Sequence, residues 1–410
     1  MRASFATTAL CGAIAASAAA LPPNSGLPIL RPIEELVDEL VDLTPFESGG
    51  FELISPQQAK ADAEKPDHFD PFQVFWPHGH DHGHGHGGGG KAAGHKPGST
   101  SQATGAPELA SPATPTPTPA VVTPKKGCSG FRERKEWRNV PDADKLAFVN
   151  AIKCLMRNPS AGNYPGSKSR WEDLVSVHQQ LTPKIHMVGQ FLPWHRYYLS
   201  IFESILRQEC SFNGTLPWWD ETKDAGHFST APMFTDAYLG RAPVKTNDGR
   251  GTCVNSGLFK GTVLHIGPGS NFTDHCLSRA VDESLTSEVT MDFVKSCNAH
   301  ANYTNMESCA EMGPHAYGHN GIGAVMGDVA SSPGDPSFFL HHAFVDHNWR
   351  IWQNKDVENR LYQIGGFTTQ GGNTPVTLDY VLTSNGLRPD VKVRDVMDTM
   401  GGYLCYAYDY

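Results

Sequence analysis

Two sets of three histidines stand at spacings that suit metal ligands. His315 and His319 are one helical turn apart in the sequence, so on a helix their imidazoles would lie on the same face. His342 falls near the start of another expected helix, for which Asp335-Pro336 is a typical start signal. The other set lies upstream and consists of His178, His186 and His195. The spacing predicts imidazoles that converge on a metal centre.

The donor type limits which metals this centre can hold. None of the six positions is a carboxylate, whereas di-iron carboxylate proteins and most dinuclear hydrolases place Asp or Glu there. All-imidazole ligation favours copper, zinc or iron and disfavours magnesium and calcium. A single histidine beside aromatic residues would more often be an ordinary core residue, so the prediction depends on all six together.

Apolar periodicity predicts the helices that would position these histidines. Leu146, Val149, Ile152 and Leu155 repeat on one face after Pro141, and His178 shares a face with Trp171 and Leu174. A loop with Pro183 and His186 precedes a helix that begins near Pro193 and carries His195. We expect a mainly α fold, a four-helix bundle around the metal centre. Residues 211–300 should form irregular, disulfide-tied loops, and the tail 376–410 a few short strands.

The rest of the chain divides into segments of different composition. Residues 1–20 are typical of a signal peptide, and 21–76 of a propeptide or appendage. Residues 77–126 read as a disordered linker, first His-rich and then rich in Ser, Thr and Pro, with a candidate processing site at Lys125-Lys126. The tract 77–97 would be either a loose metal binder or a plain polar linker. Residues 127–410 form the globular domain.

Charge and cysteine content indicate a secreted protein without nucleic-acid or membrane partners. The formal net charge is -10, which disfavours anionic surfaces as partners. Eight cysteines lie beyond Cys11 and predict up to four disulfides of open connectivity. Sequons at Asn213, Asn271 and Asn302 fit a glycoprotein. We expect a monomer or weak dimer.

Two stretches carry a resemblance to a known family. HMVGQFLPWHRYYLSIFE and DPSFFLHHAFVDHNWRIWQ resemble the copper A and copper B signatures of tyrosinases and catechol oxidases, the type 3 copper proteins. The resemblance spans residues 128–410 and is greatest to short secreted fungal members. It implies two copper ions with O2 as co-substrate, copper A on His178, His186 and His195, and copper B on His315, His319 and His342.

The same resemblance implies roles for residues around the ligands. His341 would support the site without binding metal, Phe338 would wall the copper pair, and Asp346 would orient a ligand imidazole. Arg134 would pack against the Tyr406-Ala407-Tyr408 pattern that ends the catalytic core of these proteins.

Departures from the family pattern bear on the substrate. Lys184 replaces a cysteine that in many members is crosslinked to the second copper A histidine. Glu311 matches a glutamate that helps to hold a phenol-deprotonating water, but Ala316 replaces its Asn or Asp partner, and Asn320 is a weak substitute. The resemblance thus implies oxidation of o-diphenols to o-quinones, with weak or no monophenol hydroxylation.

Other functions remain open at this point. An o-aminophenol oxidase or a full tyrosinase would use the same centre, and a haemocyanin-like oxygen carrier would use it without turnover. A metal-buffering protein centred on residues 77–97 is a further alternative.

Overall fold

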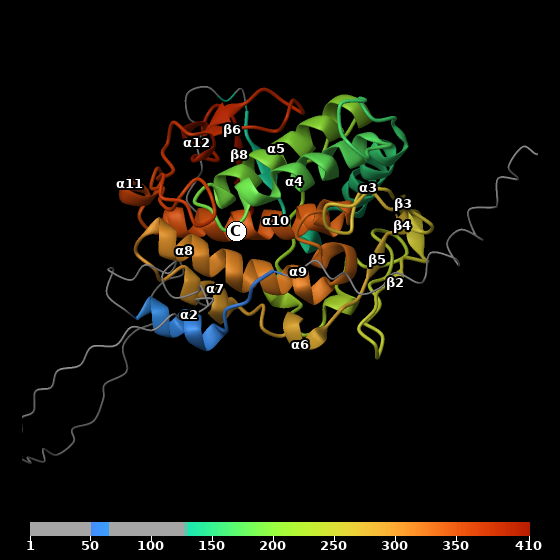
Figure 1. Cartoon of the computed structure of the whole chain (residues 1–410), viewed down its shortest axis with the longest axis horizontal. Helices are drawn as coiled ribbons and strands as arrows, with labels where there is room; N and C mark the ends of the chain where they lie inside the picture. The colour runs from blue at the N-terminus through green and yellow to red at the C-terminus, as the bar shows by residue number, and fades with distance from the viewer. Residues whose placement is uncertain (1–50, 65–127, 129) are drawn as a thin grey trace, which may run out of the picture.

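The computed structural model describes residues 51–64, 128 and 130–410 (Figure 1). The predicted signal peptide 1–20 and linker 77–126 lie outside the described residues, as does most of the segment 21–76. Within the described part, no helix is long and apolar enough to cross a membrane.

Four long helical segments surround the centre of the molecule. These are α4 (Arg170–Ile185), α5 (Phe191–Cys210), α10 (Ser337–Asn354) and the α8–α9 segment, in which α8 (Tyr303–Ala310) continues through a π-helical stretch (Glu311–His315) into α9 (Ala316–Ile322). In Figure 1, α10 crosses the middle, with α4 and α5 on one side and α8 and α9 on the other. The mainly α, four-helix prediction is confirmed.

Aromatic packing fixes α4, α5 and α10 against one another. Phe202 of α5 stacks on Phe339 of α10 with ring centroids 3.6 Å apart, and Trp171 of α4 meets Phe339 edge-on at 5.5 Å. All three side chains are fully buried. Large aromatic surfaces dominate the energetics of such a core, so the histidine-bearing helices rest on a rigid apolar layer.

The helix expected after Pro141 is α3 (Asp142–Arg157), but the predicted buried face of this helix is wrong at one residue. Leu146 is 41% exposed, whereas Val149, Ile152 and Leu155 are buried, and Phe148 completes the core-facing stripe. A stripe built on steps of three alone drifts around a helix of 3.6 residues per turn. Leu146, at its end, is therefore carried to the surface.

Two other helix boundaries differ from the sequence prediction. Pro183 lies inside α4, which ends only at Ile185, so the expected loop is reduced to the residues around His186. α10 begins at Ser337 instead of Pro336. The capping group is nevertheless the expected one, because the Asp335 carboxylate accepts a hydrogen bond of 2.9 Å from the Ser337 N–H.

Short elements complete the domain. The two-stranded pairs are β1 (Arg132–Arg134) with β8 (Tyr406–Tyr408), β2 (Thr252–Cys253) with β5 (Ser278–Arg279), β3 (Val263–Leu264) with β4 (His275–Cys276), and β6 (Val381–Leu382) with β7 (Val391–Lys392). The short helices are α6 (Glu283–Thr286), α7 (Met291–Cys297), α11 (Val357–Arg360) and α12 (Val393–Val396). Single 3₁₀ turns occupy Trp137–Asn139, Glu221–Lys223, Phe228–Thr230, Gly257–Phe259, Ala324–Gly327 and Ser332–Gly334. The tail strands are as predicted, but α6 and α7 correct the expectation of irregular loops throughout 211–300.

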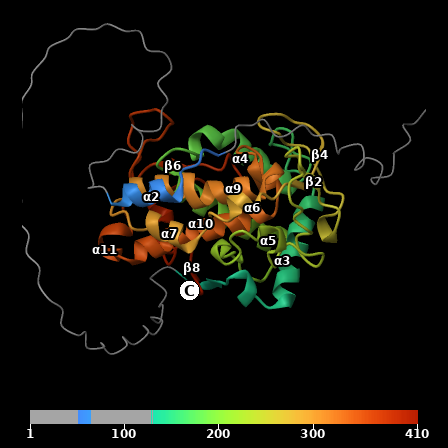
Figure 2. The ribbon, with the colours of Figure 1, turned by 90° about the horizontal axis from the view of Figure 1, so that it is seen from below.

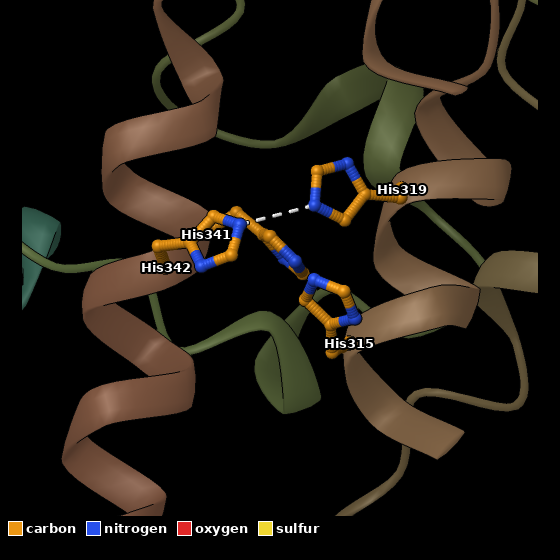
Figure 3. A group of neighbouring side chains, drawn as sticks. All are labelled: His315, His319, His341 and His342. Carbon is orange, nitrogen blue, oxygen red and sulfur yellow. Dashed lines mark hydrogen bonds between the residues drawn. The ribbon is translucent and has the colours of Figure 1, made fainter. Parts of the chain in front are cut away.

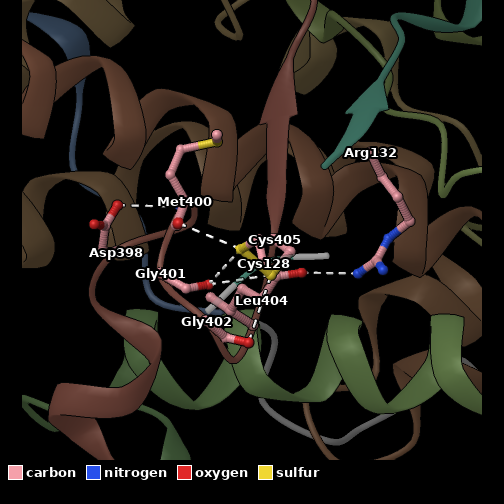
Figure 4. The surroundings of a disulfide bond; sticks show 8 residues. All are labelled: Cys128, Arg132, Asp398, Met400, Gly401, Gly402, Leu404 and Cys405. Carbon is pink, nitrogen blue, oxygen red and sulfur yellow. Dashed lines mark hydrogen bonds between the residues drawn. A yellow bond between two sulfur atoms is a disulfide. The ribbon is translucent and has the colours of Figure 1, made fainter. Parts of the chain in front are cut away.

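Four disulfides use all eight predicted cysteines. They are Cys128–Cys405, Cys154–Cys210, Cys253–Cys276 and Cys297–Cys309. Cys128–Cys405 joins the start of the domain to its end, beside a hydrogen bond of 2.8 Å from Arg132 to the Leu404 carbonyl (Figure 4). The predicted number is confirmed, and the structure supplies the connectivity.

One helix from the N-terminal segment docks on this domain. α2 (Pro56–Ala63) lies beside α7 in both views (Figures 1 and 2). Ser55 caps it by accepting a hydrogen bond from the Gln58 N–H, and Ala59 is completely buried. The residues just before α2 run along α9 towards the histidines.

Candidate metal centre

The six predicted histidines converge at the middle of the helix bundle. His178 projects from α4, His186 ends that helix, and His195 projects from α5; the nitrogens of these three that could bind a metal lie within 4.8 Å of one another. The second group has four members, whose candidate ligand nitrogens also lie within 4.8 Å of one another: His315, His319, His341 and His342 (Figure 3). The two sets adjoin, because the His195 and His342 rings stack with centroids 4.4 Å apart.

The main chain holds five of the six imidazoles in one tautomer. Their Nδ1–H groups donate to backbone carbonyls at 2.7–3.3 Å, in the pairs His178–Ala330, His186–Thr182, His195–Phe191, His315–Glu311 and His319–Met326. A carbonyl cannot donate, so each Nδ1 carries the proton and each Nε2 presents a lone pair. Metal-binding histidines usually donate their other ring N–H to such a carbonyl, which fixes the tautomer and the direction of the ring.

The buried Nε2 atoms fit a metal ion. In the described part of the chain, the Nε2 atoms of His178, His186, His195 and His315 are buried without a hydrogen-bond partner. A buried acceptor without a partner is costly, and a cation would satisfy several at once. Burial lowers the pKa of all six imidazoles, that of His178 to about 4. The rings are therefore neutral and ready to ligate two ions, three per ion.

His342 differs from the other five. Its Nε2 lies 3.2 Å from Nε2 of His319 (Figure 3), and its buried Nδ1 has no hydrogen-bond partner among the described residues. Because His319 keeps its proton on Nδ1, the His342 Nε2–H donates to His319 in the metal-free arrangement. To bind a metal ion through Nε2 as a neutral ligand, His342 would carry its proton on Nδ1 instead.

His341 sits against the second set but is held differently. Its Nδ1 donates to Glu221 Oε1 at 2.7 Å, and its ring centroid is 4.5 Å from that of His319. Gly318 makes room for it, since a Cβ there would lie 2.6 Å from His341 Cε1. Sequence reasoning missed Glu221, because this buried carboxyl comes from a short turn far from both histidine motifs.

Phe338 lies between the two sets. Its ring centroid is 4.1 Å from that of His342, 5.3 Å from His178 and 5.7 Å from His319, and the side chain is fully buried. It contributes only apolar surface, so it shields the centre from solvent and shapes the space beside the imidazoles.

The role expected for Asp346 is wrong. Its carboxylate accepts hydrogen bonds of 2.5 Å from Arg196 and from the hydroxyls of Tyr406 and Tyr408, and Arg134 is 3.6 Å away. These charged and hydroxyl donors occupy both oxygens, so no imidazole of the metal centre is oriented by Asp346. The expected packing of Arg134 on the tyrosine pattern is present, with its guanidinium 3.6 Å above the Tyr406 ring.

Glu311 is buried beside both sets. Its Oε1 accepts a hydrogen bond of 2.8 Å from the Met187 N–H, next to His186, and its backbone carbonyl accepts from His315. Burial raises the pKa of Glu311 to about 8, and burial beside Glu311 also raises the pKa of Glu307. Ala316 is completely buried and offers no polar side-chain atom.

The loop of His186 is held by more than packing. Gln190 donates to the Lys184 carbonyl at 2.7 Å and Gln370 to the His186 carbonyl at 3.0 Å. With the Glu311–Met187 bond, these contacts fix the ring of His186 without a covalent crosslink. Distant Gln370 has no sequence signal that would have revealed this role.

Phe51, from the N-terminal segment, reaches the metal centre. Its ring stacks on that of His319 at 4.3 Å and meets the edges of His315 at 5.0 Å and His186 at 5.7 Å. The Asn320 side chain donates to the Phe51 carbonyl at 2.9 Å. Asn320 thus contacts this segment in the structure.

Comparison with known proteins identifies the family. The common central domain of tyrosinase matches residues 168–355. Tyrosinase-like protein phomQ1 of Diaporthe leptostromiformis is 33% identical over 321 residues, which cover 70% of this chain and 80% of that protein. N-acetyl-6-hydroxytryptophan oxidase ivoB of Emericella nidulans is 31% identical over 336 residues, covering 67% and 92% respectively. A polyphenol oxidase structure from Thermothelomyces thermophila has a TM-score of 0.62 and 27% identity, covering 68% of this chain and 89% of that one.

The helical bundle with paired all-histidine sites defines a protein of the dinuclear copper class. The chain belongs to the tyrosinase family. Its relatives are named as tyrosinases and oxidases, and it is a copper-dependent oxidoreductase.

Proposed function

We propose that this enzyme is a secreted dicopper oxidase that converts o-diphenols to o-quinones and hydroxylates monophenols weakly or not at all. The observation that supports the substrate preference most directly is Ala316, which offers no polar side-chain atom next to His315 to act together with buried Glu311. Two diphenols each give up an electron pair and both hydroxyl protons, and these four electrons and four protons reduce one O2 to two water molecules.

The chain's own residues would prepare the site for this step. Copper, when bound by the two triads, would supply the redox chemistry with O2. Burial keeps the imidazoles neutral, the main-chain carbonyls fix their orientation, and Phe338 excludes water from one side of the centre. An o-diphenol has a readily oxidised second hydroxyl, so it does not need a dedicated base as a monophenol does.

The experiment is oxygen uptake by the copper-loaded protein with catechol, tyrosol and 2-aminophenol. We expect faster uptake with catechol than with tyrosol. Rapid, lag-free uptake with tyrosol would favour a full tyrosinase, and preferred turnover of 2-aminophenol would favour the o-aminophenol oxidase.

A second candidate substrate class is an aromatic amino acid in amide linkage. Phe51 is itself an aromatic amino acid in amide linkage. Its ring stacks on His319, and its carbonyl accepts a hydrogen bond from Asn320. One relative is named for N-acetyl-6-hydroxytryptophan. A preference for N-acetyl-dopa methylamide over 4-methylcatechol that disappears in Asn320→Leu would support this class, and equal kcat/KM values would exclude it.

Separate features support the proposed secretion. Residues 1–20 have the composition of a signal peptide, and all eight remaining cysteines are paired, as is usual in oxidising compartments. N-terminal sequencing of the protein from culture medium should begin after residue 20 or, if the linker is processed, after Lys126.

A further inference from the structure

The first described residue of the N-terminal segment occupies the space where a substrate ring would bind. Phe51 touches His186 of one triad and His315 and His319 of the other. These contacts are those of an aromatic ring packed among imidazoles, with one stacked ring and two edge-to-face partners. A phenol that reacted at the copper pair would need the same position.

Specific polar contacts hold this ring in place. The Asn320 amide donates to the Phe51 carbonyl at 2.9 Å, and the Ile54 N–H donates to the Met312 carbonyl at 3.0 Å. Met312 belongs to the π-helical stretch that carries His315. The segment is therefore anchored to the same element that positions the second triad.

Beyond Phe51, apolar side chains seal the segment against the domain. Ile54 is 4% exposed and Ala59 is fully buried, and both belong to the core cluster of the domain. Ser55 and Pro56 start α2 at the point where the chain turns away from the centre. In both views α2 lies beside α7 (Figures 1 and 2).

We propose that residues 51–64 are a built-in blocking segment that keeps the enzyme latent, with the ring of Phe51 in the substrate position. The nature of the displaced substrate rests on the proposed function. The blocking segment must leave, or be cut free, before a phenol can approach both triads.

No disulfide can tie the blocking segment to the domain, so cleavage of the chain can release it. There is no cysteine between Cys11 and Cys128, so no disulfide would retain the segment after cleavage between residues 65 and 127. While the chain is intact, the linker keeps the segment at an effective concentration on the order of millimolar. Cleavage would remove this high effective concentration. At a micromolar protein concentration, the few anchoring residues would then not keep the fragment bound. Lys125-Lys126 is a candidate cleavage point.

Cleavage of the full chain tests the proposal. A recognition sequence for a site-specific protease would be inserted within residues 98–124, and the copper-loaded protein assayed with catechol before and after cutting. We expect kcat/KM to rise about 10-fold or more after cutting and dilution, and a synthetic peptide of residues 51–64 to restore inhibition competitively. The same peptide with Phe51→Ala should inhibit far less. Equal kcat/KM before and after release of the fragment would overturn the proposal.

A second readout does not depend on catalysis. Hydrogen exchange of residues 51–64, followed by mass spectrometry, should be slow in the intact chain and fast after cutting, because the Ile54 N–H is bonded to Met312. Exchange at the rate of unstructured peptide in the intact chain would also overturn the proposal. Slow exchange with no catechol oxidation in either form would instead count against the proposed substrate.

Point variants in the uncut chain provide matched controls. Phe51→Ala should raise catechol oxidation several-fold, because the ring over His319 is lost while α2 stays docked. Leu53→Ala, at a side chain that is 37% exposed, should leave the activity of the latent form unchanged. Equal activity of the Phe51→Ala and Leu53→Ala proteins at equal copper content would contradict a role for the Phe51 ring.

Discussion

Main-chain carbonyls, and not carboxylates, orient most of the imidazoles at this copper centre. Five of six ligand candidates donate Nδ1–H to a carbonyl, and three of those carbonyls lie one turn earlier in the same helical segment, as in His195–Phe191. Local helix geometry therefore sets both the tautomer and the ring direction. The six histidines could be predicted from sequence because their spacing and the two motifs are local. Glu221, Gln370 and the true partners of Asp346 could not, because only the tertiary fold brings them to the site.

A polar side chain at position 316 should increase the turnover of monophenols. Ala316→Asn should raise the ratio of tyrosol to catechol turnover about 10-fold, since a side-chain acceptor beside Glu311 would help to hold a water that deprotonates the phenol. Ala316→Leu has nearly the same bulk without the amide and serves as the control. If both variants changed the ratio alike, volume and not hydrogen bonding would be responsible.

Copper content distinguishes ligand from neighbour at His341-His342. We expect His342→Ala to lose copper from the second site, because His342 contributes a triad nitrogen that has no carbonyl or carboxylate partner. His341→Phe should retain about as much copper as the wild type, since His341 is tied to Glu221. Metal analysis of both purified proteins checks this, and copper loss in His341→Phe alone would reverse the assignment.

At the scale of elements, Asp346 joins α10 to the C-terminal strand. It binds Arg196 of α5, Tyr406 and Tyr408 of β8, and lies near Arg134 of β1. Burial alone would raise the pKa of Asp346, but Arg196 and Arg134 and the two hydroxyls hold it below its usual range. The helix and its capping residue were readable from the sequence. The partners that Asp346 has in place of an imidazole could not be predicted, because they lie far from it in the sequence.

Removal of this charge should destabilise the domain. Asp346→Asn leaves two buried guanidinium groups poorly compensated, which costs about 3–5 kcal/mol. The loss should be measured by guanidinium unfolding at pH 7. Asp379→Asn, which alters an exposed ion pair with Lys392 and Arg394, should unfold at the wild-type midpoint. An Asp346→Asn protein as stable as the wild type would show that the buried cluster is not needed for stability.

A π-helical stretch connects two of the α-helices at the centre. Glu311–His315 contains Gly313 with non-helical backbone angles, followed by Pro314, and it links α8 to α9. π-helical insertions of this kind often mark functional sites. Here the insertion sets the direction of His315 and gives Met312 a carbonyl that the blocking segment uses.

At the scale of the whole molecule, a neutral buried histidine cluster couples stability to pH. Burial depresses the pKa of His178 from 6.5 to about 4 and lowers that of the other five ligand candidates. Unfolded histidines take up protons before folded ones do. The stabilising effect is therefore present above pH 6.5 and is lost as the pH falls toward 4.

This coupling predicts how copper removal changes acid stability. The metal-free protein should lose free energy of unfolding between pH 6.5 and 4, by roughly 3 kcal/mol for His178 alone. Bound copper competes with protons for the same nitrogens, so the loaded protein should show a transition shifted to lower pH. Denaturant titrations at several pH values would check this, and coincident curves for loaded and metal-free protein would contradict it.

The mainly helical architecture and the number of disulfides followed from composition and periodicity. The pairing of the cysteines and the docking of residues 51–64 did not, because both depend on contacts between residues far apart in the chain. Cys128–Cys405 and the β1–β8 pair close the domain end to end, while the blocking segment reaches its centre from outside. The blocking segment thus contacts α9, one of the helices that carry the histidines of the redox centre.

Initial oxygen uptake by the copper-loaded protein, freed of residues 51–64 by cleavage, tests the central claim most directly. With catechol we predict immediate, saturable uptake that ceases in His178→Ala, and with tyrosol at least 10-fold slower uptake. Uptake with tyrosol as fast as with catechol, or no uptake with either at full copper content, would contradict the account.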